Sequence, residues 1–251
     1  MIPIDFSGKV VLITGGGRGI GRSTALRCAE AGADAVIFDL KEDESRDAVQ
    51  QIESAGKKAS FYRVDISNEA QVNAGVEKTL KEYGRIDFFV NSAAITSKQP
   101  FTELSPEVWD KTLNVNLTGP FLCCKAVVPV MIQQGGGRIV LISSGSALTG
   151  SGGGAHYASS KGGLISLVRA LSRELAQHNI LVNCLAPRNV RTELLEGIYK
   201  NEQLEAMANQ TPLKRLSTPE EIANVILFLC SDLSTYLTGQ MILVDGGRTY
   251  S

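Results

Sequence analysis

The sequence lacks the features that mark several classes of protein. Phenylalanine, tryptophan and tyrosine together make up only 6% of the 251 residues, and the chain contains two histidines. The acidic and basic side chains nearly cancel, which gives a formal net charge of -1. Without a basic excess, the chain has no electrostatic footprint for nucleic acid or an anionic membrane. No run approaches the ~18 uninterrupted apolar residues of a membrane span, because the best candidate, Phe121 to Ile132, contains Lys125 and Pro129. We therefore expect neither nucleic acid nor membrane as a partner.

Cysteine is also scarce and carries no metal-binding pattern. The cysteines are odd in number and none belongs to a C-x-x-C pair: Cys28, Cys123, Cys124, Cys184 and Cys230. Most lie in apolar segments, where a free thiol behaves as a small hydrophobe. This usage favours a reducing compartment and predicts no disulfide framework and no metal site. The N-terminal segment lacks the basic region of a signal peptide, so we expect a cytoplasmic protein.

What the sequence does contain is enough apolar material for a large core. Hydrophobic residues make up 43% of the chain, and a chain of this length can bury roughly 70–75% of its unfolded surface. The length prior of ~150 residues per domain allows one or two domains. Because no linker, repeat or low-complexity tract divides the sequence, we expect a single domain over residues 1–251.

Short β-branched runs alternate with longer helical patterns along the chain. The expected strands are Val10 to Thr14, Ala35 to Phe38, Ala59 to Val64, Ile86 to Val90, Arg138 to Ile142, Ile180 to Leu185 and Met241 to Val244. The expected helices are Ile20 to Ala31, Glu44 to Ala55, Glu69 to Tyr83, Pro106 to Gln134, Ala155 to Gln177 and Pro219 to Cys230. The first four strands are read as continuously apolar, which is typical of strands covered on both faces. The pattern predicts an α/β fold: a doubly wound parallel sheet of about seven strands with helices on both faces. The least regular stretch, residues 188–218, is predicted to be a mobile substrate lid.

A glycine-rich turn follows the first expected strand, in the run Thr14-Gly15-Gly16-Gly17-Arg18-Gly19-Ile20-Gly21. Such a turn between a strand and a helix brings backbone N–H groups close to a phosphate at the positive end of the helix dipole. The spacing is G-x-x-x-G-x-G rather than G-x-G-x-x-G, and a plain tight turn is the alternative. The strand before and the helix after favour a dinucleotide site.

Asp39 ends the second expected strand, at the edge of the sheet where dinucleotides bind. A carboxylate there can accept hydrogen bonds from both ribose hydroxyls of adenosine, and it would repel a 2′-phosphate. Arg18 argues the other way, because a loop arginine could meet a 2′-phosphate. Leu40, not a basic residue, follows Asp39. We expect NAD as the cofactor, with NADP the less favoured alternative.

Four further residues form a candidate catalytic group. Tyr157 and Lys161 are four residues apart on an expected helix and so share one face, although such a pair alone is typical of a helix surface. Ser144 lies just past the fifth expected strand, and Asn116 interrupts a helical pattern in which asparagine is a poor helix former. Ser143 is the alternative to Ser144 as the serine of this candidate catalytic group.

Taken in order and spacing, these residues resemble the short-chain dehydrogenase/reductase family over nearly the whole chain. The family's glycine loop, its catalytic Asn, Ser, Tyr and Lys and its ending match Thr14 to Gly21, Asn116, Ser144, Tyr157, Lys161 and Asp245-Gly246-Gly247. Its N-N-A-G segment matches Asn91 to Ala94 only in part. Its P-G-x-x-x-T segment matches Pro187 and Thr192, but Arg188 replaces the glycine. The resemblance implies a Rossmann fold and favours Ser144 over Ser143.

The resemblance also implies a set of residues for the cofactor, of which Asp65 would contact the adenine. They are Gly15, Gly17, Arg18, Gly19, Ile20, Gly21, Asp39, Asp65, Ile66, Asn91, Ala93, Tyr157, Lys161, Pro187, Val190 and Thr192. Members of the family commonly assemble as tetramers through their long helices, so we expect a homo-oligomer, with a tetramer favoured.

The expected chemistry interconverts a secondary alcohol and a ketone by hydride transfer to or from the nicotinamide. Tyr157 would give or take the proton as general acid/base, and its ordinary pKa of ~10 would have to fall by ~2–3 for activity near neutrality. Lys161 and the positive nicotinamide would supply that field. Ser144 would hydrogen-bond the substrate oxygen, and Asn116 would anchor a water that links Lys161 to solvent.

Two alternatives to this function stay open. One is an NADPH-dependent 3-oxoacyl thioester (acyl-carrier-protein) reductase, against which Asp39 argues. The other is a dinucleotide-binding protein that has lost catalysis.

The substrate pocket should be lined by Ser146 to Gly154, His156 and the 188–218 lid. His156 is expected to be a packing residue or a wall of this pocket. For Arg188 we weigh two interpretations: a guanidinium turned outward to solvent or a lid carboxylate such as Glu193, or one that reaches the pocket and pairs with an anionic substrate.

Overall fold

The seven expected strands form one parallel sheet in a computed structural model that describes residues 4–249. The strands are β1 (Val10–Thr14), β2 (Asp34–Asp39), β3 (Ala59–Arg63), β4 (Phe88–Asn91), β5 (Gly137–Ile142), β6 (Ile180–Pro187) and β7 (Met241–Val244). Their order is β3-β2-β1-β4-β5-β6-β7. The chain therefore reverses direction across the sheet between β1 and β4, which is the switch point where such sheets bind ligands. The predicted α/β doubly wound class is confirmed.

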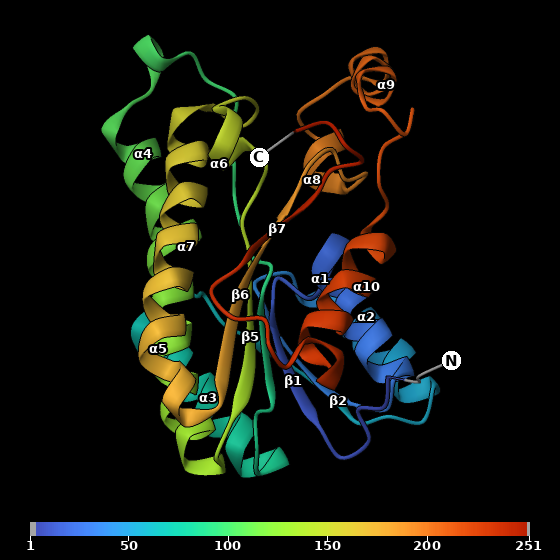
Figure 1. The fold of residues 1–251 in the computed structure, drawn as a ribbon, viewed down its shortest axis with the longest axis vertical. Helices are drawn as coiled ribbons and strands as arrows, with labels where there is room; N and C mark the ends of the chain where they lie inside the picture. The colour runs from blue at the N-terminus through green and yellow to red at the C-terminus, as the bar shows by residue number, and fades with distance from the viewer. Residues whose placement is uncertain (1–3, 250–251) are drawn as a thin grey trace.

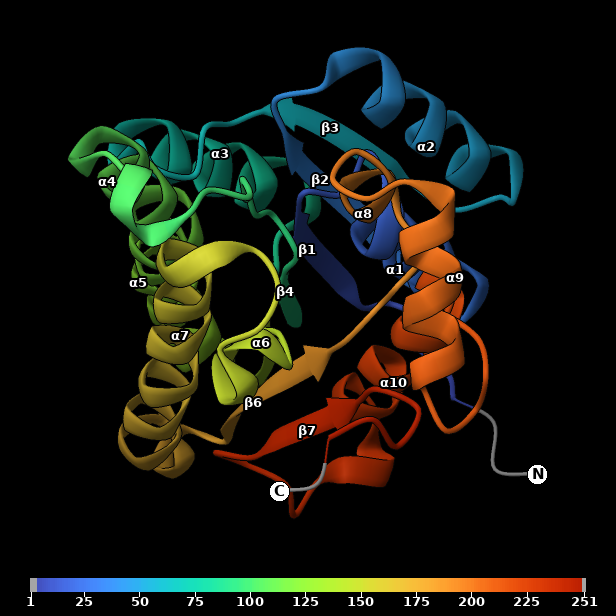
Figure 2. The ribbon, with the colours of Figure 1, turned by 90° about the horizontal axis from the view of Figure 1, so that it is seen from above.

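Helices cover both faces of this sheet (Figure 1). The longer ones are α1 (Gly19–Glu30), α2 (Glu42–Ser54), α3 (Glu69–Tyr83), α4 (Pro106–Leu113), α5 (Gly119–Gln134), α7 (Gly154–Leu175), α9 (Asn201–Gln210) and α10 (Pro219–Cys230). Figure 1 shows α1, α2 and α10 on one side and α3, α4, α5 and α7 on the other. Figure 2, seen from above, shows α9 and the short helices α6 (Ser146–Thr149) and α8 (Glu193–Glu196) near the strand ends.

Alternate residues of each strand feed two separate apolar cores. Ile13 of β1 lies in the core that α1 and α10 close, together with Ile226. Leu12 lies in the opposite core, which α5 and α7 close with Val127 and Leu164. All five of these side chains are fully buried. Burial on both faces is why the central strands must be apolar at every position.

Strand β3 departs from the expected pattern of continuous apolar burial. It forms the edge of the sheet, and Ser60, Phe61 and Tyr62 are only half-buried. The Tyr62 hydroxyl donates a hydrogen bond to Glu82 on α3 at 2.5 Å. An edge strand has a neighbouring strand on one side only. Its side chains are therefore covered less by the rest of the sheet, and they contact solvent and polar partners.

The long predicted helix over Pro106 to Gln134 is divided. Residues Asn114–Thr118 form a π-helical turn between α4 and α5. Taken together, Pro106–Gln134 are long and apolar enough to cross a membrane by length and composition, and 39% of the most apolar window is buried. This is weak evidence for a membrane span, because a helix that packs on a sheet core passes the same test. Here Cys123, Val127 and Met131 of α5 are buried in the second core.

The expectation of an irregular stretch over residues 188–218 was partly wrong. Helices α8 and α9 form within it, and α8 begins where the Thr192 hydroxyl accepts a hydrogen bond from the Leu195 N–H. Both helices are short, and only Leu204 of α9 is buried. Such helices bury too little apolar surface to leave a strong period in the sequence.

Candidate active site

The glycine loop between β1 and α1 is held by backbone packing that excludes side chains. Gly15 has a φ of +68°, and a Cβ there would lie 2.7 Å from the Ala93 backbone. A Cβ on Gly21 would lie 2.1 Å from the Gly15 carbonyl oxygen. Only glycine allows these close approaches. The loop thus brings the start of α1 to the carboxyl edge of the sheet beside β4.

Asp39, at the end of β2, is fixed by three backbone donors. Its Oδ1 accepts hydrogen bonds from the N–H groups of Leu40 at 2.7 Å and Lys41 at 3.0 Å. Its Oδ2 accepts one from the Gly17 N–H at 3.0 Å. A Cβ on Gly17 would lie 3.1 Å from Oδ2 and 2.7 Å from the Ser45 hydroxyl. The absence of a side chain on Gly17 therefore allows the carboxylate to lie against the loop. The carboxylate is an oriented, partly exposed negative charge.

A cavity of about 840 Å³ runs along this edge of the sheet beside Asp39. Nine of the residues predicted for the cofactor line it: Gly15, Arg18, Gly19, Ile20, Asp39, Asp65, Ile66, Ala93 and Thr192. The volume falls in the range of small-molecule and cofactor sites. The loop and the ends of β2, β3 and β4 therefore meet around one hollow, as the resemblance implies.

Three predicted cofactor residues support this cavity without lining it. Gly17 orients Asp39, and Gly21 packs on Gly15. Asn91, at the end of β4, is fully buried, and its Oδ1 accepts a hydrogen bond from the Thr14 hydroxyl at 2.8 Å. The Thr14–Asn91 bond ties β1 to β4 at the switch point.

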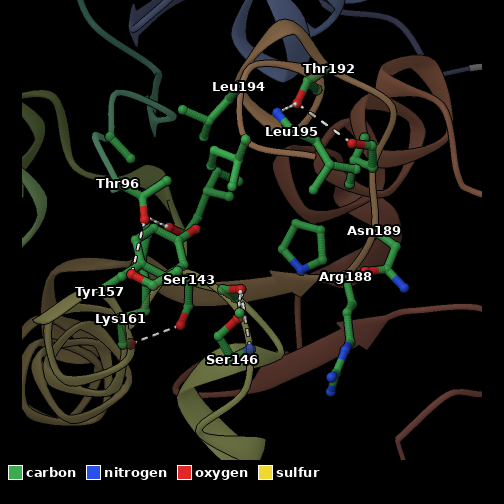
Figure 3. A pocket seen from close by; sticks show the side chains of 18 of the residues that line it. Thr96, Ser143, Ser146, Tyr157, Lys161, Arg188, Asn189, Thr192, Leu194 and Leu195 are labelled. Atoms are coloured by element: carbon green, nitrogen blue, oxygen red, sulfur yellow. Dashed lines mark hydrogen bonds between the residues drawn. The ribbon is translucent and has the colours of Figure 1, made fainter. Parts of the chain in front are cut away.

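A second cavity, of about 310 Å³, lies beside β5, β6 and α7. Ser144, Tyr157 and Lys161 line it, together with the predicted cofactor residues Pro187 and Val190. The two cavities share a wall, made by Ile20, Ser92, Ala94, Thr192 and Leu194. Figure 3 shows Tyr157 and Lys161 side by side, with Thr96 next to the tyrosine.

Tyr157 and Lys161 come from successive turns of α7, and Lys161 is buried whereas Tyr157 is half-buried. The Lys161 ammonium lies 5.7 Å from the centre of the Tyr157 ring and donates a hydrogen bond to the Ile142 carbonyl at 2.7 Å. Burial lowers the pKa of Lys161 to about 8. Burial also raises the pKa of Tyr157, and the Ser144 hydroxyl opposes this rise. The lowering of the Tyr157 pKa that was expected from Lys161 and a bound nicotinamide stays a prediction.

Ser144 and Ser143 differ in what their hydroxyls already bind. The Ser143 hydroxyl donates to the Lys161 backbone carbonyl at 2.7 Å and so anchors α7 to the end of β5. The Ser144 hydroxyl lies 3.2 Å from the Ser146 hydroxyl, which also faces the cavity. At 3.2 Å this is a long hydrogen bond between two hydroxyls, which is weak and easily exchanged for a ligand oxygen, so the geometry favours Ser144 as the substrate contact.

Asn116 lies inside the π-helical turn and not in either cavity. Its Nδ2 donates to the Ile95 carbonyl at 2.9 Å and the Ser160 hydroxyl at 3.1 Å, and its Oδ1 accepts from the Ile95 N–H at 2.9 Å. The Ser160 hydroxyl in turn donates to the Tyr157 carbonyl at 2.8 Å. The Asn116 side chain thus ties the loop after β4 to the helix that carries Tyr157, and its role in anchoring a water stays a prediction.

The chain between α6 and Tyr157 is rich in glycines with positive φ. Gly150, Gly152, Gly153 and Gly154 have φ values between +64° and +85°. A Cβ on Gly153 would lie 2.5 Å from the Tyr157 ring. Glycine is thus required where the backbone passes over the tyrosine, and the segment forms the wall predicted for the substrate pocket.

His156 and Arg188 are placed differently from parts of the expectation. His156 is fully buried outside the cavity, with Nε2 lying 3.1 Å from the Ser97 hydroxyl, so it is a packing residue. Arg188 does not pair with Glu193. Its Nη1 donates to the hydroxyls of Thr149 at 2.9 Å and Thr249 at 3.2 Å, and its Nη2 donates to Ser151. Its stem passes over Gly145, where a Cβ would lie 3.2 Å from Arg188 Cδ.

Sequence reasoning missed two polar residues of the second cavity, Thr96 and Arg248. Thr96 donates a hydrogen bond to the Gly153 carbonyl at 3.1 Å from the loop after β4. Arg248 donates to the Met207 carbonyl at 3.1 Å and the Gln210 side chain at 2.6 Å, at the end of α9. Neither residue belongs to a motif, and only the folded chain brings them to the site.

Comparison with known proteins gives consistent matches over nearly the full chain. A family model described as Enoyl-(Acyl carrier protein) reductase matches residues 15–249. The 3-oxoacyl-[acyl-carrier-protein] reductase FabG of Chlamydia pneumoniae is 38% identical, covering 98% of this chain and 99% of that protein. The (2S)-[(R)-hydroxy(phenyl)methyl]succinyl-CoA dehydrogenase subunit BbsD of Thauera aromatica is 40% identical, covering 96% of each. The crystal structure of levodione reductase superposes with a TM-score of 0.93 at 32% identity, covering 97% of this chain and 98% of that one.

Proposed function

Because this chain belongs to the short-chain dehydrogenase/reductase family, we propose that its joined cavities hold NAD and a small secondary alcohol or ketone. As a member it is an oxidoreductase that interconverts a CH–OH group and a carbonyl with a nicotinamide dinucleotide. The observation that carries the proposal is that Tyr157, Ser144 and Lys161 line one cavity, which shares a wall with the cavity beside Asp39.

The cofactor supplies or accepts the hydride, and the residues of the chain handle the proton. The Tyr157 hydroxyl donates a proton to the ketone oxygen during reduction, or takes one from the alcohol during oxidation. The Ser144 hydroxyl hydrogen-bonds the same oxygen as negative charge develops on it. Lys161, held against the Ile142 carbonyl, would hold the nicotinamide ribose and would favour the phenolate of Tyr157 electrostatically. Asn116 positions α7 through Ser160.

The preference for NAD rests on Asp39. Three backbone N–H groups orient its carboxylate at the cofactor cavity, where it can accept hydrogen bonds from both adenosine ribose hydroxyls. A 2′-phosphate there would bring two negative charges together at partial burial, which is unfavourable. Arg18 also lines this cavity and makes no hydrogen bond to Asp39 among those formed by residues 4–249. Arg18 therefore does not neutralise the Asp39 carboxylate through a direct hydrogen bond.

The test compares the dissociation constants of NADH and NADPH for the wild type, Asp39→Asn and Asp43→Asn. The wild type should bind NADH at least about ten-fold more tightly, a difference of about 1.4 kcal/mol. Asp39→Asn keeps the size of the side chain but removes its charge, so the ratio should narrow. Asp43, an exposed carboxylate at the start of α2, is the matched control and should leave the ratio unchanged. Tighter binding of NADPH by the wild type would refute the assignment.

A second candidate function is reduction of a 3-oxoacyl thioester. The identity to 3-oxoacyl-[acyl-carrier-protein] reductases over nearly the whole chain favours it. A steady-state assay with acetoacetyl-CoA separates the two. Efficient NADPH-dependent reduction would favour the thioester reductase, whereas turnover of simple ketones and alcohols with NAD would favour the first proposal.

We propose a single domain whose residues 188–218 act as a substrate lid, since α8 and α9 contribute Leu194, Leu195 and Met207 to the second cavity. The five buried free thiols support a cytoplasmic location. We further propose a homotetramer that works without a membrane or nucleic acid. Size-exclusion chromatography with light scattering tests the tetramer.

A further inference from the structure

The charges that line the substrate cavity are all of one sign. Among the described residues around it, Lys161, Arg188 and Arg248 are ionisable cations and none is an Asp or Glu. The rest of the wall is mainly serine, glycine and aliphatic side chains. Lys161 is assigned to the reaction and the cofactor ribose, which leaves two arginines without a role in the proposed chemistry.

Both arginines have neutral hydrogen-bond partners within residues 4–249. Arg188 donates to the hydroxyls of Thr149, Ser151 and Thr249. Arg248 donates to a backbone carbonyl and to the amide oxygen of Gln210. A guanidinium carries five N–H donors, so each of these side chains keeps donors for a further acceptor.

The two arginines line the same cavity, and the positive charge of one acts on the other. Burial lowers the pKa of Arg188, and the positive charge of Arg248 lowers it further. The negative charge of Asp245 acts on Arg188 in the other direction. However, the Asp245 oxygens already accept hydrogen bonds from the N–H groups of Gly247 at 3.0 Å and Thr249 at 2.7 Å. Two neighbouring cations without a shared carboxylate favour an external anion between them.

The position of the pair fixes where that anion would lie relative to the reacting carbon. Figure 3 shows Arg188 extending from the end of β6 away from Tyr157 and Lys161. Leu194, Leu195 and Met207 line the same cavity. A ligand that spans it meets the proton donor at one end, an aliphatic wall along its length and the arginines at the other end.

We infer that the substrate of this enzyme is an oxo or hydroxy acid whose carboxylate is bound by Arg188 and Arg248, remote from the ketone or alcohol at Tyr157. The inference rests on the proposed function and names its substrate class. Arg188 takes the place of the glycine in the family's P-G-x-x-x-T segment, so the feature belongs to this chain and not to the motif. Its stem fits there because Gly145 has no side chain.

The test uses straight-chain methyl-ketone acids, from acetoacetate and levulinate to longer members, each beside its methyl ester. The ratio of kcat/KM for acid over ester should exceed about ten for at least one chain length. In Arg248→Gln and Arg188→Gln this ratio should fall toward one, and Arg248→Lys should keep part of it. Arg173→Gln, which changes an exposed arginine on α7, is the matched control and should leave the ratio unchanged.

A binding arm separates this inference from the proposed function. Glutarate has two carboxylates and no ketone, so its affinity by calorimetry does not depend on turnover. The wild type saturated with NADH should bind glutarate about ten-fold or more tightly than Arg248→Gln does. Equal kcat/KM for acids and esters at every length, or equal glutarate affinity in the two proteins, overturns the inference. Failure of the wild type to reduce any ester or acid refutes the proposed function, whereas the glutarate result still decides the arginine pair.

Discussion

The two halves of the active site are built from different kinds of sequence. The cofactor side is assembled at the ends of β1 to β4 from a loop in which glycines are required by backbone contacts, such as Gly21 against the Gly15 carbonyl. The substrate side is assembled from loops, short helices and the last residues of the chain, with Arg248 and Met207 meeting from separate segments. The geometry of the cofactor side is therefore set by the backbone, whereas that of the substrate side is set by the side chains that separate segments bring together.

This contrast explains which half can vary without loss of the fold. A loop that needs glycine for its path cannot change without moving the strands it joins. Side chains that line the far end of a cavity can change with little effect on the sheet, so they are free to define the substrate. The departure of Arg188 from the family segment lies on this variable side.

Tyr157→Phe should separate the two halves most completely. The variant keeps the ring and loses only the hydroxyl that transfers the proton, so kcat should fall by ~10²–10⁴-fold. The dissociation constant of NADH should stay within about two-fold of the wild-type value, as judged by fluorescence titration. Turnover close to that of the wild type would remove Tyr157 from the mechanism.

Gly21→Ala should break the backbone side. Its Cβ would lie 2.1 Å from the Gly15 carbonyl oxygen, and backbone cannot be displaced as a flexible side chain can. We expect the free energy of unfolding in urea to fall by about 3 kcal/mol, with loss of cofactor binding. Gly162→Ala in α7 is the control, because its Cβ would meet no atom within 4 Å. The free energy of unfolding of Gly162→Ala should rise by up to about 1 kcal/mol, because alanine has the higher helix propensity. If Gly21→Ala and Gly162→Ala changed the free energy of unfolding equally, the glycine loop would not depend on backbone contacts as proposed.

The third and smallest effect concerns the charge of Lys161 on the substrate side. Its pKa in the folded chain is lowered to about 8, whereas the unfolded chain keeps the proton to about pH 10. Between these values the unfolded state binds more protons, so this lysine adds stability as pH rises. From about pH 8 to about pH 9, the cofactor-free wild type should gain about 1 kcal/mol relative to Lys161→Met in its free energy of unfolding.

The comparison with Lys161→Met is needed because other groups act in the opposite direction. The buried thiols of Cys123, Cys124 and Cys230 have raised pKa values, so they remove stability as pH rises above about 9. They are common to both proteins and cancel in the difference. A difference that stays flat across this range would show that burial does not lower the pKa of Lys161.

The same contrast describes what could be predicted from the sequence. Continuous apolar strands and the glycine loop predicted the sheet and its class, because each depends on backbone geometry that leaves a fixed pattern. Nine of the residues that line the cofactor cavity were implied by the family resemblance. The edge position of β3 was missed, since strand order is set by long-range pairing and not by local composition. The π-helical turn at Asn116 was also missed, because Asn114–Thr118 differ from an ordinary helix only in hydrogen-bond register.

The substrate side could be predicted only where a motif runs through it. Ser144, Tyr157 and Lys161 were placed together correctly by spacing and resemblance. The partners of Arg188 were not foreseen, because Thr149, Ser151 and Thr249 are common residues that converge only in the folded chain. Arg248 escaped notice for the same reason.

The glycines that lead into Tyr157 have a consequence for how the enzyme responds to heat. Each of Gly150, Gly152, Gly153 and Gly154 gives up more backbone freedom on folding than any other residue type would, and all four are held at positive φ. The entropic gain on releasing this segment grows with temperature, while the sheet beneath it stays locked by two cores. Warming should therefore loosen the wall over the tyrosine before the strands separate, so we expect activity to be lost at a lower temperature than that at which the sheet unfolds.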